Sequence, residues 1–305
     1  MATLDLAVQL GRLSLSNPIL VASGTFGYAK EAEGFVPLHR LGGIVPKTVT
    51  VAPRAGNRPP RIVETASGML NSIGLDNDGI EHFLAHHLPI LREVGTKIII
   101  NVAGKSDDEF GWLGDRIAKE QGIAAAELNL SCPNVSGGID FATNPERAAK
   151  VISLFKSACD FPILAKLTPN VTDIVEIASA AKSAGADAVT LINTLLGTAI
   201  DWRKSTPILG NVFGGLSGPA IKPVALRCVL QVSQRVKMPI VAAGGIANID
   251  DVMEFLIAGA SAIQVGTANF YDPSASVRIL DQLEASLNEI AAERVTSIIG
   301  TVKLS

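Results

Sequence analysis

The residue with the clearest chemical potential is Cys132, in the segment 129–134 with the sequence Asn-Leu-Ser-Cys-Pro-Asn. A free cysteine is most often a small buried apolar residue, and this interpretation fits Cys159 and Cys228, which fall within or beside helical patterns. It fits Cys132 poorly, because serine, proline and asparagine on either side are typical of a polar loop. A thiol of ordinary pKa, about 8.5, is a few per cent thiolate at neutral pH. We therefore predict that Cys132 is catalytic, as a general base.

Neutral or basic polar residues recur directly after short aliphatic runs, and no Asp or Glu is among them. They include Ser23, Lys47, Thr48, Asn101, Asn129, Lys166, Asn193 and Thr194. A polar residue can follow any strand, but a set so uniform is not expected from strand ends alone. Lysines supply positive charge, and amide side chains supply paired donors and acceptors. The set therefore suits an anionic, planar, amide-rich ligand.

Glycines at two further positions indicate phosphate binding. Gly244-Gly245 follows the seventh aliphatic run, and Gly266-Thr267 follows the eighth. Each pair could serve a tight turn, but in many barrels the loops after strands seven and eight and a helix N-terminus bind phosphate through backbone N–H groups. The chain contains neither a G-x-G-x-x-G fingerprint nor a P-loop. FMN, with one phosphate on a redox ring, fits better than NAD or ATP.

These residues require a scaffold in which strand ends meet, and the chain alternates strand-like runs with helical patterns. The runs are Ile19–Ala22, Gly43–Lys47, Ile98–Val102, Ala126–Leu130, Ile163–Leu167, Ala188–Ile192, Ile240–Ala243 and Ala262–Val265. The helical patterns lie near 28–39, 78–93, 106–121, 144–158, 172–184, 219–236, 249–258 and 273–290. Eight such units predict an α/β fold of the (β/α)8 TIM-barrel type, with an open doubly wound sheet as the alternative.

Three other segments complete the predicted architecture. Two short alternating stretches around Gly11 predict an N-terminal β-hairpin. Long loops are expected after strands 2 and 6, at about residues 48–77 and 194–218, and loops of this length commonly act as lids or binding loops. Since no linker or low-complexity tract divides the chain, residues 1–305 are predicted to form a single domain.

Composition and charge disfavour several classes of protein. Apolar residues make up 48% of the chain, which is enough for a large core. The net charge of -3, without a basic stripe, disfavours a nucleic-acid partner. The apolar runs are too short to span a bilayer, and the N-terminal segment has no signal-peptide pattern. We therefore expect a cytoplasmic protein with no membrane partner.

The histidines offer one arrangement compatible with a metal. His82 and His86 are four residues apart in a helical pattern, a spacing that metal sites use. No third ligand is close in sequence, and a solvated helix face explains the pair more simply. No metal site is predicted.

Taken together, the motifs resemble those of the family 1 dihydroorotate dehydrogenases, in particular the 1B branch, over nearly the whole chain. The segments that carry the resemblance are Asn71–Leu75, Asn129–Asn134, Lys166–Asp173, Asn193–Gly197, Gly214–Ala220, Ala243–Ile246 and Val265–Phe270. Membrane-bound family 2 enzymes usually have serine as the base, so Cys132 favours family 1.

The resemblance implies a dihydroorotate dehydrogenase of pyrimidine and UMP biosynthesis, with one FMN per chain. Cys132 would remove the C5 proton of dihydroorotate, while hydride leaves C6 for FMN and orotate forms. The substrate residues implied are Lys47, Asn71, Ser72, Ile73, Gly74, Leu75, Asn129, Asn193 and Thr194. The FMN residues implied are Ser23, Lys47, Thr48, Asn101, Asn129, Lys166, Ile192, Gly218, Gly244, Gly245, Gly266 and Thr267.

The 1B resemblance also implies a partner subunit that carries FAD and a [2Fe–2S] cluster and passes electrons to NAD. The three scattered cysteines of this chain cannot supply four-cysteine ligation of an ordinary cluster, which agrees with a cluster on another chain. The assembly implied is a homodimer of this subunit within a heterotetramer.

Two other functions fit parts of the pattern. A dihydropyrimidine dehydrogenase-like barrel uses a similar cysteine loop on uracil or thymine, but Lys47 is harder to explain there because uracil has no carboxylate. A non-catalytic flavin- or phosphate-binding barrel would account for the glycines without Cys132. The sequence leaves open whether NAD, fumarate or another oxidant is the final electron acceptor.

Overall fold

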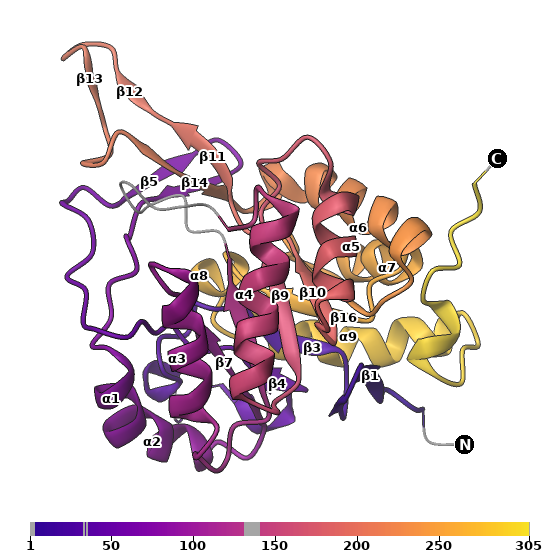
Figure 1. Ribbon diagram of the computed structural model, residues 1–305. Helices are drawn as coiled ribbons and strands as arrows, with labels where there is room; N and C mark the ends of the chain where they lie inside the picture. The colour runs from indigo at the N-terminus through magenta and orange to yellow at the C-terminus, as the bar shows by residue number, and fades with distance from the viewer. Residues whose placement is uncertain (1–3, 33, 35, 131–140, 305) are drawn as a thin grey trace.

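The computed structural model describes residues 4–32, 34, 36–130 and 141–304, and its centre is a closed barrel of eight parallel strands surrounded by helices (Figure 1). In barrel order the strands are β3 (Ile19–Val21), β4 (Gly43–Ile44), β7 (Lys97–Val102), β8 (Ala125–Asn129), β9 (Ile163–Leu167), β10 (Ala188–Leu191), β15 (Ile240–Ala243) and β16 (Ala262–Val265), and β16 closes on β3. The predicted TIM barrel is confirmed. Each of the eight predicted runs forms a barrel strand.

The aliphatic composition of the strands explains the barrel. Nearly every strand residue is inaccessible to solvent, because side chains fill the interior and helices cover the outside. The helices are α1 (Ile80–His82), α2 (Leu88–Arg92), α3 (Asp107–Ile117), α4 (Pro145–Ala158), α5 (Ile174–Ser183), α6 (Lys222–Val236), α7 (Ile249–Ala258), α8 (Ala268–Tyr271) and α9 (Ala275–Glu289). Short 3₁₀ turns lie at Pro219–Ile221 and Val295–Ile298.

One predicted helix is wrong. In place of a helix over 28–39, the described residues form two 3₁₀ turns, Lys30–Ala32 and Leu38–Arg40. Gly34, with φ of 84°, takes a left-handed conformation that ends a right-handed helix. Pro37 then disfavours a helical conformation in the residue before it.

The predicted N-terminal hairpin is present. Strands β1 (Val8–Leu10) and β2 (Leu13–Leu15) pair antiparallel around Gly11. Arg12 fixes the hairpin through its Nε, which donates to Oδ1 of Asp187 at 3.0 Å, and through an Nη1 bond to the Asp160 carbonyl at 2.8 Å. Because Asp187 directly precedes β10, the hairpin lies at the amino end of the barrel.

The two long segments after the second and sixth barrel strands are not structureless loops. They contain β5 (Ile62–Thr65), β6 (Gly68–Asn71), β11 (Leu195–Thr198), β12 (Ile200–Asp201), β13 (Thr206–Pro207) and β14 (Phe213–Ser217). Four of these strands form one antiparallel sheet in the order β11-β14-β6-β5, which joins the two segments to each other.

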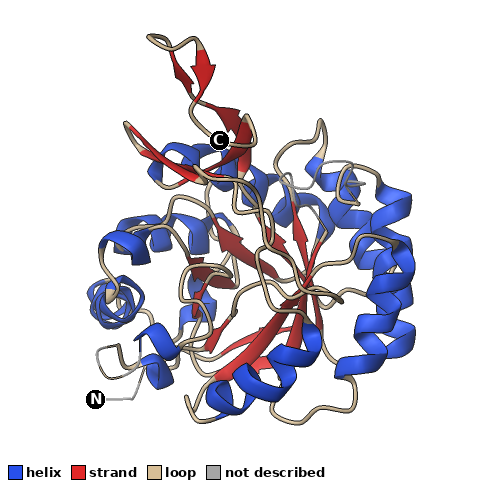
Figure 2. Cartoon of the chain, turned by 90° about the vertical axis from the view of Figure 1, so that its left-hand side faces the viewer, coloured by secondary structure: helices blue, strands red, loops and turns tan. Residues whose placement is uncertain are grey.

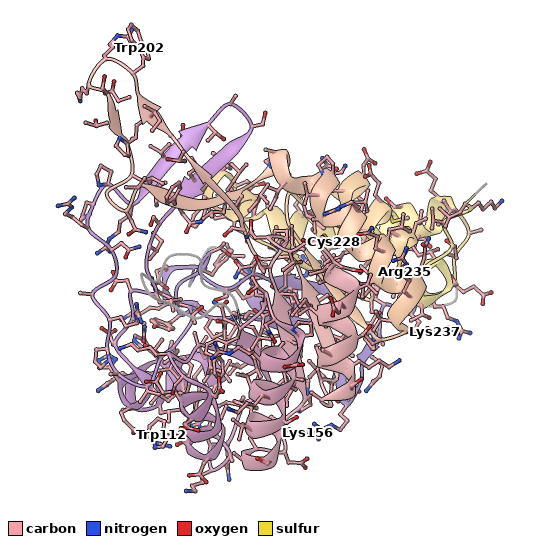
Figure 3. All side chains as sticks on the ribbon, turned by 45° about the horizontal axis from the view of Figure 1, so that its top comes forward. Trp112, Lys156, Trp202, Cys228, Arg235 and Lys237 are labelled. Carbon is pink, nitrogen blue, oxygen red and sulfur yellow. The ribbon has the colours of Figure 1, made fainter. Side chains whose placement is uncertain are left out.

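This accessory sheet stands above the barrel and continues into a projecting hairpin of β12 and β13, as Figure 2 shows. Trp202 lies at the tip of that projection and is 72% exposed (Figure 3). The pairing of β6 with β14 brings Asn71 opposite Gly215, so the sheet presents residues from both segments at the same place. Among the described residues, no helix is long and apolar enough to cross a membrane.

Candidate active site

A cavity of about 450 Å³ opens at the carboxyl end of the barrel strands, within the size range of cofactor and ligand pockets. Residues from the barrel and the accessory sheet line it together. The predicted site residues among them are Ser23, Lys47, Thr48, Asn71, Ile73, Gly74, Leu75, Asn129, Lys166, Ile192, Asn193, Thr194, Gly218, Gly244, Gly245, Gly266 and Thr267. The fold therefore brings into one cavity residues that are up to 244 positions apart, from Ser23 to Thr267. Their binding roles stay predictions.

Amide side chains form a connected line along the cavity wall. Nδ2 of Asn193 donates to Oδ1 of Asn129 at 3.2 Å, and Nδ2 of Asn129 lies 3.5 Å from Oγ1 of Thr48. The backbone N–H of Thr194 donates to Oδ1 of Asn193 at 2.8 Å. These bonds restrict the rotamers of three polar residues, which is the pre-organisation that a binding site requires.

The accessory sheet contributes a second polar wall. Asn71, the last residue of β6, donates from Nδ2 to the carbonyl of Gly215 on β14 at 3.3 Å. Ile73, Gly74 and Leu75 follow directly and line the cavity. The sheet thus holds a residue that the barrel alone could not bring to the site.

Two lysines line the cavity, and they differ in their partners. Lys47 follows β4 and is half-buried, and within the described ranges no carboxylate forms an ion pair with it. Lys166, on β9, has a side chain only 9% exposed and lies 3.4 Å from Oε1 of Glu127 through its Nζ. Lys47 is therefore available to an anionic ligand, whereas Lys166 is tied to the barrel interior.

The loop after β15 depends on glycine. Gly244 and Gly245 have φ of 128° and 75°, a region that side-chain-bearing residues rarely occupy. A Cβ on Gly245 would lie 2.7 Å from the backbone nitrogen of Lys222 at the start of α6. The loop consequently packs closely against α6 and leaves its backbone exposed to the cavity, as phosphate binding requires.

A buried acidic residue that the sequence analysis did not single out lies beneath this site. Glu127 on β8 has 0% exposure, although a charged residue is rarely fully buried unless it is paired. It accepts hydrogen bonds from side chains of four other strands. The donors are Asn101 Nδ2 at 2.7 Å, Thr190 Oγ1 at 2.8 Å, Gln264 Nε2 at 2.5 Å and Lys166 Nζ at 3.4 Å. The available signal was one charged residue inside the aliphatic run Ala126–Leu130.

Two predicted site residues do not line the cavity. Asn101 is fully buried, and its Nδ2 is bonded to Glu127 instead. Ser72 is 1% exposed, and its Oγ accepts from Nδ2 of Asn57 at 3.0 Å. Because side chains alternate between the two faces of a strand or extended segment, Ser72 lies behind the wall that its neighbours Asn71 and Ile73 form.

The three cysteines differ in what can be said of them. Cys132 lies outside the described residues, three positions beyond Asn129, which lines the cavity at the end of β8. Cys159 and Cys228 are buried, and burial raises the pKa of both thiols. Figure 3 shows Cys228 on α6, among the outer helices. These two thiols therefore have the inert, structural character expected of them.

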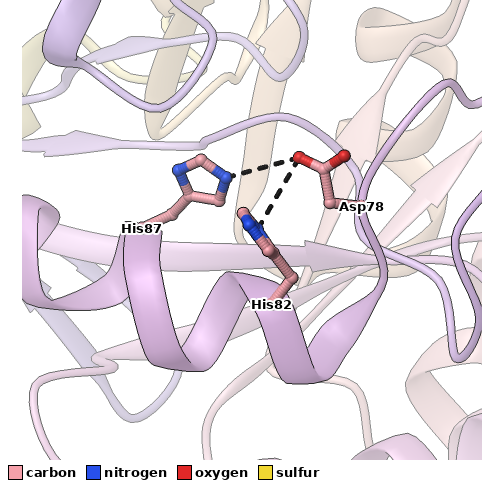
Figure 4. A group of neighbouring side chains, drawn as sticks. All are labelled: Asp78, His82 and His87. Atoms are coloured by element: carbon pink, nitrogen blue, oxygen red, sulfur yellow. Dashed lines mark ion pairs between the residues drawn. The ribbon is translucent and has the colours of Figure 1, made fainter.

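A histidine cluster lies outside the cavity, where α1 passes through a π-turn, Phe83–His87, into α2 (Figure 4). Oδ2 of Asp78 lies 3.7 Å from Nδ1 of His82 and 3.6 Å from Nε2 of His87. The π-turn brings His82 and His87, which are five positions apart, onto one face, where both rings face Asp78. Burial lowers the pKa of His87, whose ring stacks on Tyr28 at 3.8 Å.

Comparison with known proteins gives a consistent result. The family profile described as dihydroorotate dehydrogenase matches residues 5–287. Curated relatives named dihydroorotate dehydrogenase B (NAD(+)), catalytic subunit, include proteins of Desulforamulus reducens and Geotalea daltonii. The first is 49% identical over 302 residues, 99% of each chain, and the second is 50% identical over 305 residues, the whole of each chain. A Geotalea uraniireducens protein of the same name is 50% identical over 299 residues, 98% of each chain.

Proposed function

The chain belongs to the dihydroorotate dehydrogenase family, and from this premise we propose that it is the catalytic subunit of an NAD-linked dihydroorotate dehydrogenase. It oxidises dihydroorotate to orotate in pyrimidine biosynthesis, within a single FMN-binding barrel domain. Relatives of that name share about half of their residues with this chain over its full length, which supports the assignment. The observation that carries it is the cavity at the carboxyl ends of the strands, with its lysines and amide-bearing residues.

The cavity residues fit FMN. The glycine loop after β15 offers free backbone for a phosphate, and Gly266 and Thr267 line the same cavity. Lys166 supplies a nearly buried cation, which suits a ring that gains negative charge on reduction. The proposed FMN residues all line the cavity except Asn101, and they are Ser23, Lys47, Thr48, Asn101, Asn129, Lys166, Ile192, Gly218, Gly244, Gly245, Gly266 and Thr267. When bound, FMN supplies the acceptor for the hydride that leaves C6 of the substrate.

The substrate residues follow from its chemistry. Dihydroorotate is a cyclic ureide with a carboxylate, so it needs amide partners and positive charge. Asn71, Asn129 and Asn193 supply paired donors and acceptors around the ring, and Thr194 adds a hydroxyl. Lys47, which has no ion pair in the described part of the chain, attracts the carboxylate. The backbone of residues 72–75 completes the pocket beside Asn71.

Cys132 is proposed as the base. Its thiolate accepts the proton from C5 as the C6 hydride leaves, and the electron pair of the C5–H bond becomes the C5–C6 double bond of orotate. Atoms and charge balance, because one proton passes to sulfur and one hydride to the acceptor.

A comparison of two substrates tests the function. The purified chain should form orotate from dihydroorotate in the presence of an artificial electron acceptor and should leave dihydrouracil unoxidised. The preference is expected because dihydrouracil has no carboxylate for Lys47. Oxidation of dihydrouracil alone would support a dihydropyrimidine dehydrogenase-like activity, and oxidation of neither compound would support a non-catalytic barrel.

We also propose an electron-transfer partner with FAD and a [2Fe–2S] cluster, on a homodimer of this chain within a heterotetramer. The words "catalytic subunit" in the names of the relatives support a partner. The three cysteines of this chain are too few for an ordinary cluster. Affinity purification from the native cell should yield a second chain with FAD and iron–sulfur absorbance, and NAD reduction should require it. NAD reduction by this chain alone would contradict the proposal.

A further inference from the structure

Glu127 is a carboxylate fully enclosed within the barrel and held from four sides. Oε1 accepts from Nδ2 of Asn101 at 2.7 Å and lies 3.4 Å from Nζ of Lys166. Oε2 accepts from Thr190 at 2.8 Å and from Nε2 of Gln264 at 2.5 Å. The donors come from β7, β9, β10 and β16, so together with β8 the carboxylate links five of the eight barrel strands.

This network is not a closed structural cluster. Lys166 and Gln264 both line the cavity, so two of the four donors extend from the carboxylate to the ligand site. Oδ1 of Asn101 and Oε1 of Gln264 are buried without a hydrogen-bond partner in the described part of the chain. Buried polar groups are nearly always paired, and orphaned ones indicate strain or function. The hydrogen-bond network around Glu127 is therefore better explained by a role at the cavity than by packing of the barrel interior.

We propose that Glu127 is a positioning residue that holds the Lys166 ammonium at the cavity floor and limits the positive charge that Lys166 presents to the cofactor. This inference rests on the proposed binding of FMN. Glu127 does not itself line the cavity, so it acts through Lys166 and Gln264. Its effect is to keep the flavin environment close to neutral before reduction.

The reasoning is electrostatic. Inside a protein, opposite charges a few ångströms apart interact strongly, because little water screens them. Lys166 alone would present a full positive charge to a ring that becomes anionic on reduction. With Glu127 3.4 Å behind it, the pair is neutral overall, and the reduced ring is stabilised less. Glu127 thereby sets the reduction potential low enough for electrons to leave toward a partner.

Glu127→Gln removes the charge and keeps the size of the side chain, and it also turns one acceptor oxygen into an NH2 donor, which is why charge-retaining and paired variants accompany it. Sulfite adds to oxidised flavin and makes the ring anionic, so its dissociation constant reports the local charge without dihydroorotate. In the FMN-containing protein we expect sulfite to bind about tenfold more tightly, equivalent to a rise of about 30 mV in the two-electron potential. An unchanged or weaker affinity would overturn the proposal.

Two variants serve as controls. Glu127→Asp keeps the charge and should bind sulfite as the wild-type protein does; a shift as large as that of Glu127→Gln would contradict a charge effect. Asp187→Asn removes another carboxylate that pairs with a cation, at the opposite end of the barrel. It should leave the sulfite affinity unchanged, because the hydrogen-bond partners of its carboxylate in the described residues, Arg12 and Ile163, do not line the cavity.

A paired substitution covers the case in which Glu127→Gln does not fold. Lys166→Met alone leaves a buried anion without its cation, which is strongly destabilising. The double variant Glu127→Gln, Lys166→Met removes both charges and should unfold at a higher temperature than Lys166→Met. A double variant no more stable than the single one would overturn the pairing.

The sulfite titration needs bound FMN and no dihydroorotate. Failure of dihydroorotate oxidation would therefore leave this inference standing, whereas an unchanged sulfite affinity would leave the proposed function standing. Wild-type protein that does not bind added FMN would contradict both.

Discussion

The two ends of the barrel each contain a carboxylate paired with a cation, and the two pairs differ in what surrounds them. At the amino end, the side chain of Asp187 is 8% exposed and accepts from Nε and Nη2 of Arg12, at 3.0 and 3.1 Å, and from the backbone nitrogens of Arg12 and Ile163. Neither Arg12 nor Ile163 lines the cavity. Toward the carboxyl end, Glu127 is fully buried, and two of its partners line the cavity.

This difference indicates that the pair at the amino end stabilises the protein, whereas the pair toward the carboxyl end belongs to the ligand site. The Arg12–Asp187 pair closes a local network and joins the N-terminal hairpin to the start of β9 and β10. The Lys166–Glu127 pair has a long contact of 3.4 Å and orphaned amide oxygens beside it. A network complete in itself stabilises the protein, whereas one left incomplete next to a cavity is suited to a ligand. In barrels, catalysis belongs to the carboxyl end and the opposite end serves stability.

The largest effect that should distinguish the two ends comes from Cys132→Ser. Loss of a general base should slow flavin reduction by dihydroorotate by roughly 10²–10⁴-fold, while FMN and orotate stay bound. Stopped-flow absorbance of the FMN-containing protein measures the rate. Cys228→Ser is the matched control and should leave the rate near that of the wild type, because Cys228 lies buried on α6. Unchanged kinetics in Cys132→Ser would remove it as the base.

Lys47→Ala should have the next largest effect. A charge-assisted hydrogen bond contributes about 1.5–3 kcal/mol, so orotate affinity should fall about tenfold to a hundredfold. Uracil, which has no carboxylate, should bind the variant and the wild type equally. Titrations followed through the flavin spectrum compare the two ligands. An equal loss for both would show that Lys47 acts through the shape of the pocket and not on the carboxylate.

Asp187→Asn tests the amino end. Loss of the charged acceptor should reduce the free energy of unfolding by about 1–3 kcal/mol, because Arg12 and the backbone of Ile163 lose their partner. Dihydroorotate oxidation by the folded variant should match the wild type. Denaturant unfolding and steady-state assays at the same temperature give the two values. A large loss of activity in the folded variant would contradict the claim that the amino end contributes to stability and not to catalysis.

The pH dependence of stability should change by a smaller amount. Burial raises the pKa of Asp187, but hydrogen bonds from Arg12 and Ile163 outweigh it and hold the pKa below its ordinary value. A carboxylate with a depressed folded pKa contributes stability above its unfolded pKa of about 3.9, and this contribution is lost as pH falls through the folded value. The stability difference between wild type and Asp187→Asn should thus be constant near neutrality and shrink below about pH 4. If the stability difference persisted in stronger acid, the ionised carboxylate of Asp187 would not be its source.

Much of the fold follows from the sequence, because buried parallel strands are continuous aliphatic runs. Ile163–Leu167 and Ile240–Ala243 were predicted with the bounds that the structure has. The helix at 28–39 was wrong, because Gly34 and Pro37 interrupt it. The accessory sheet was missed because its central pairing, β6 with β14, joins residues about 145 positions apart, such as Asn71 and Gly215, and local patterns carry no information on such a pairing.

The site was predictable to the extent that strand ends define it. Lys47, Asn129 and Lys166 meet at the cavity, because the carboxyl ends of parallel strands converge. Asn101 was expected at the cavity and lies behind its wall, because the direction in which a strand side chain points decides whether it reaches the cavity. Glu127 was missed because a charged residue is normally at the surface, and only the three-dimensional structure supplies its four donors.

Anaerobic addition of dihydroorotate to the FMN-containing protein tests the central claim most directly. The flavin should lose its oxidised absorbance in a single turnover, with one orotate formed per FMN. The same addition of dihydrouracil should leave the spectrum oxidised. A flavin that stays oxidised with dihydroorotate, in protein shown to bind orotate, would contradict the assignment of the cavity as a dihydroorotate dehydrogenase site.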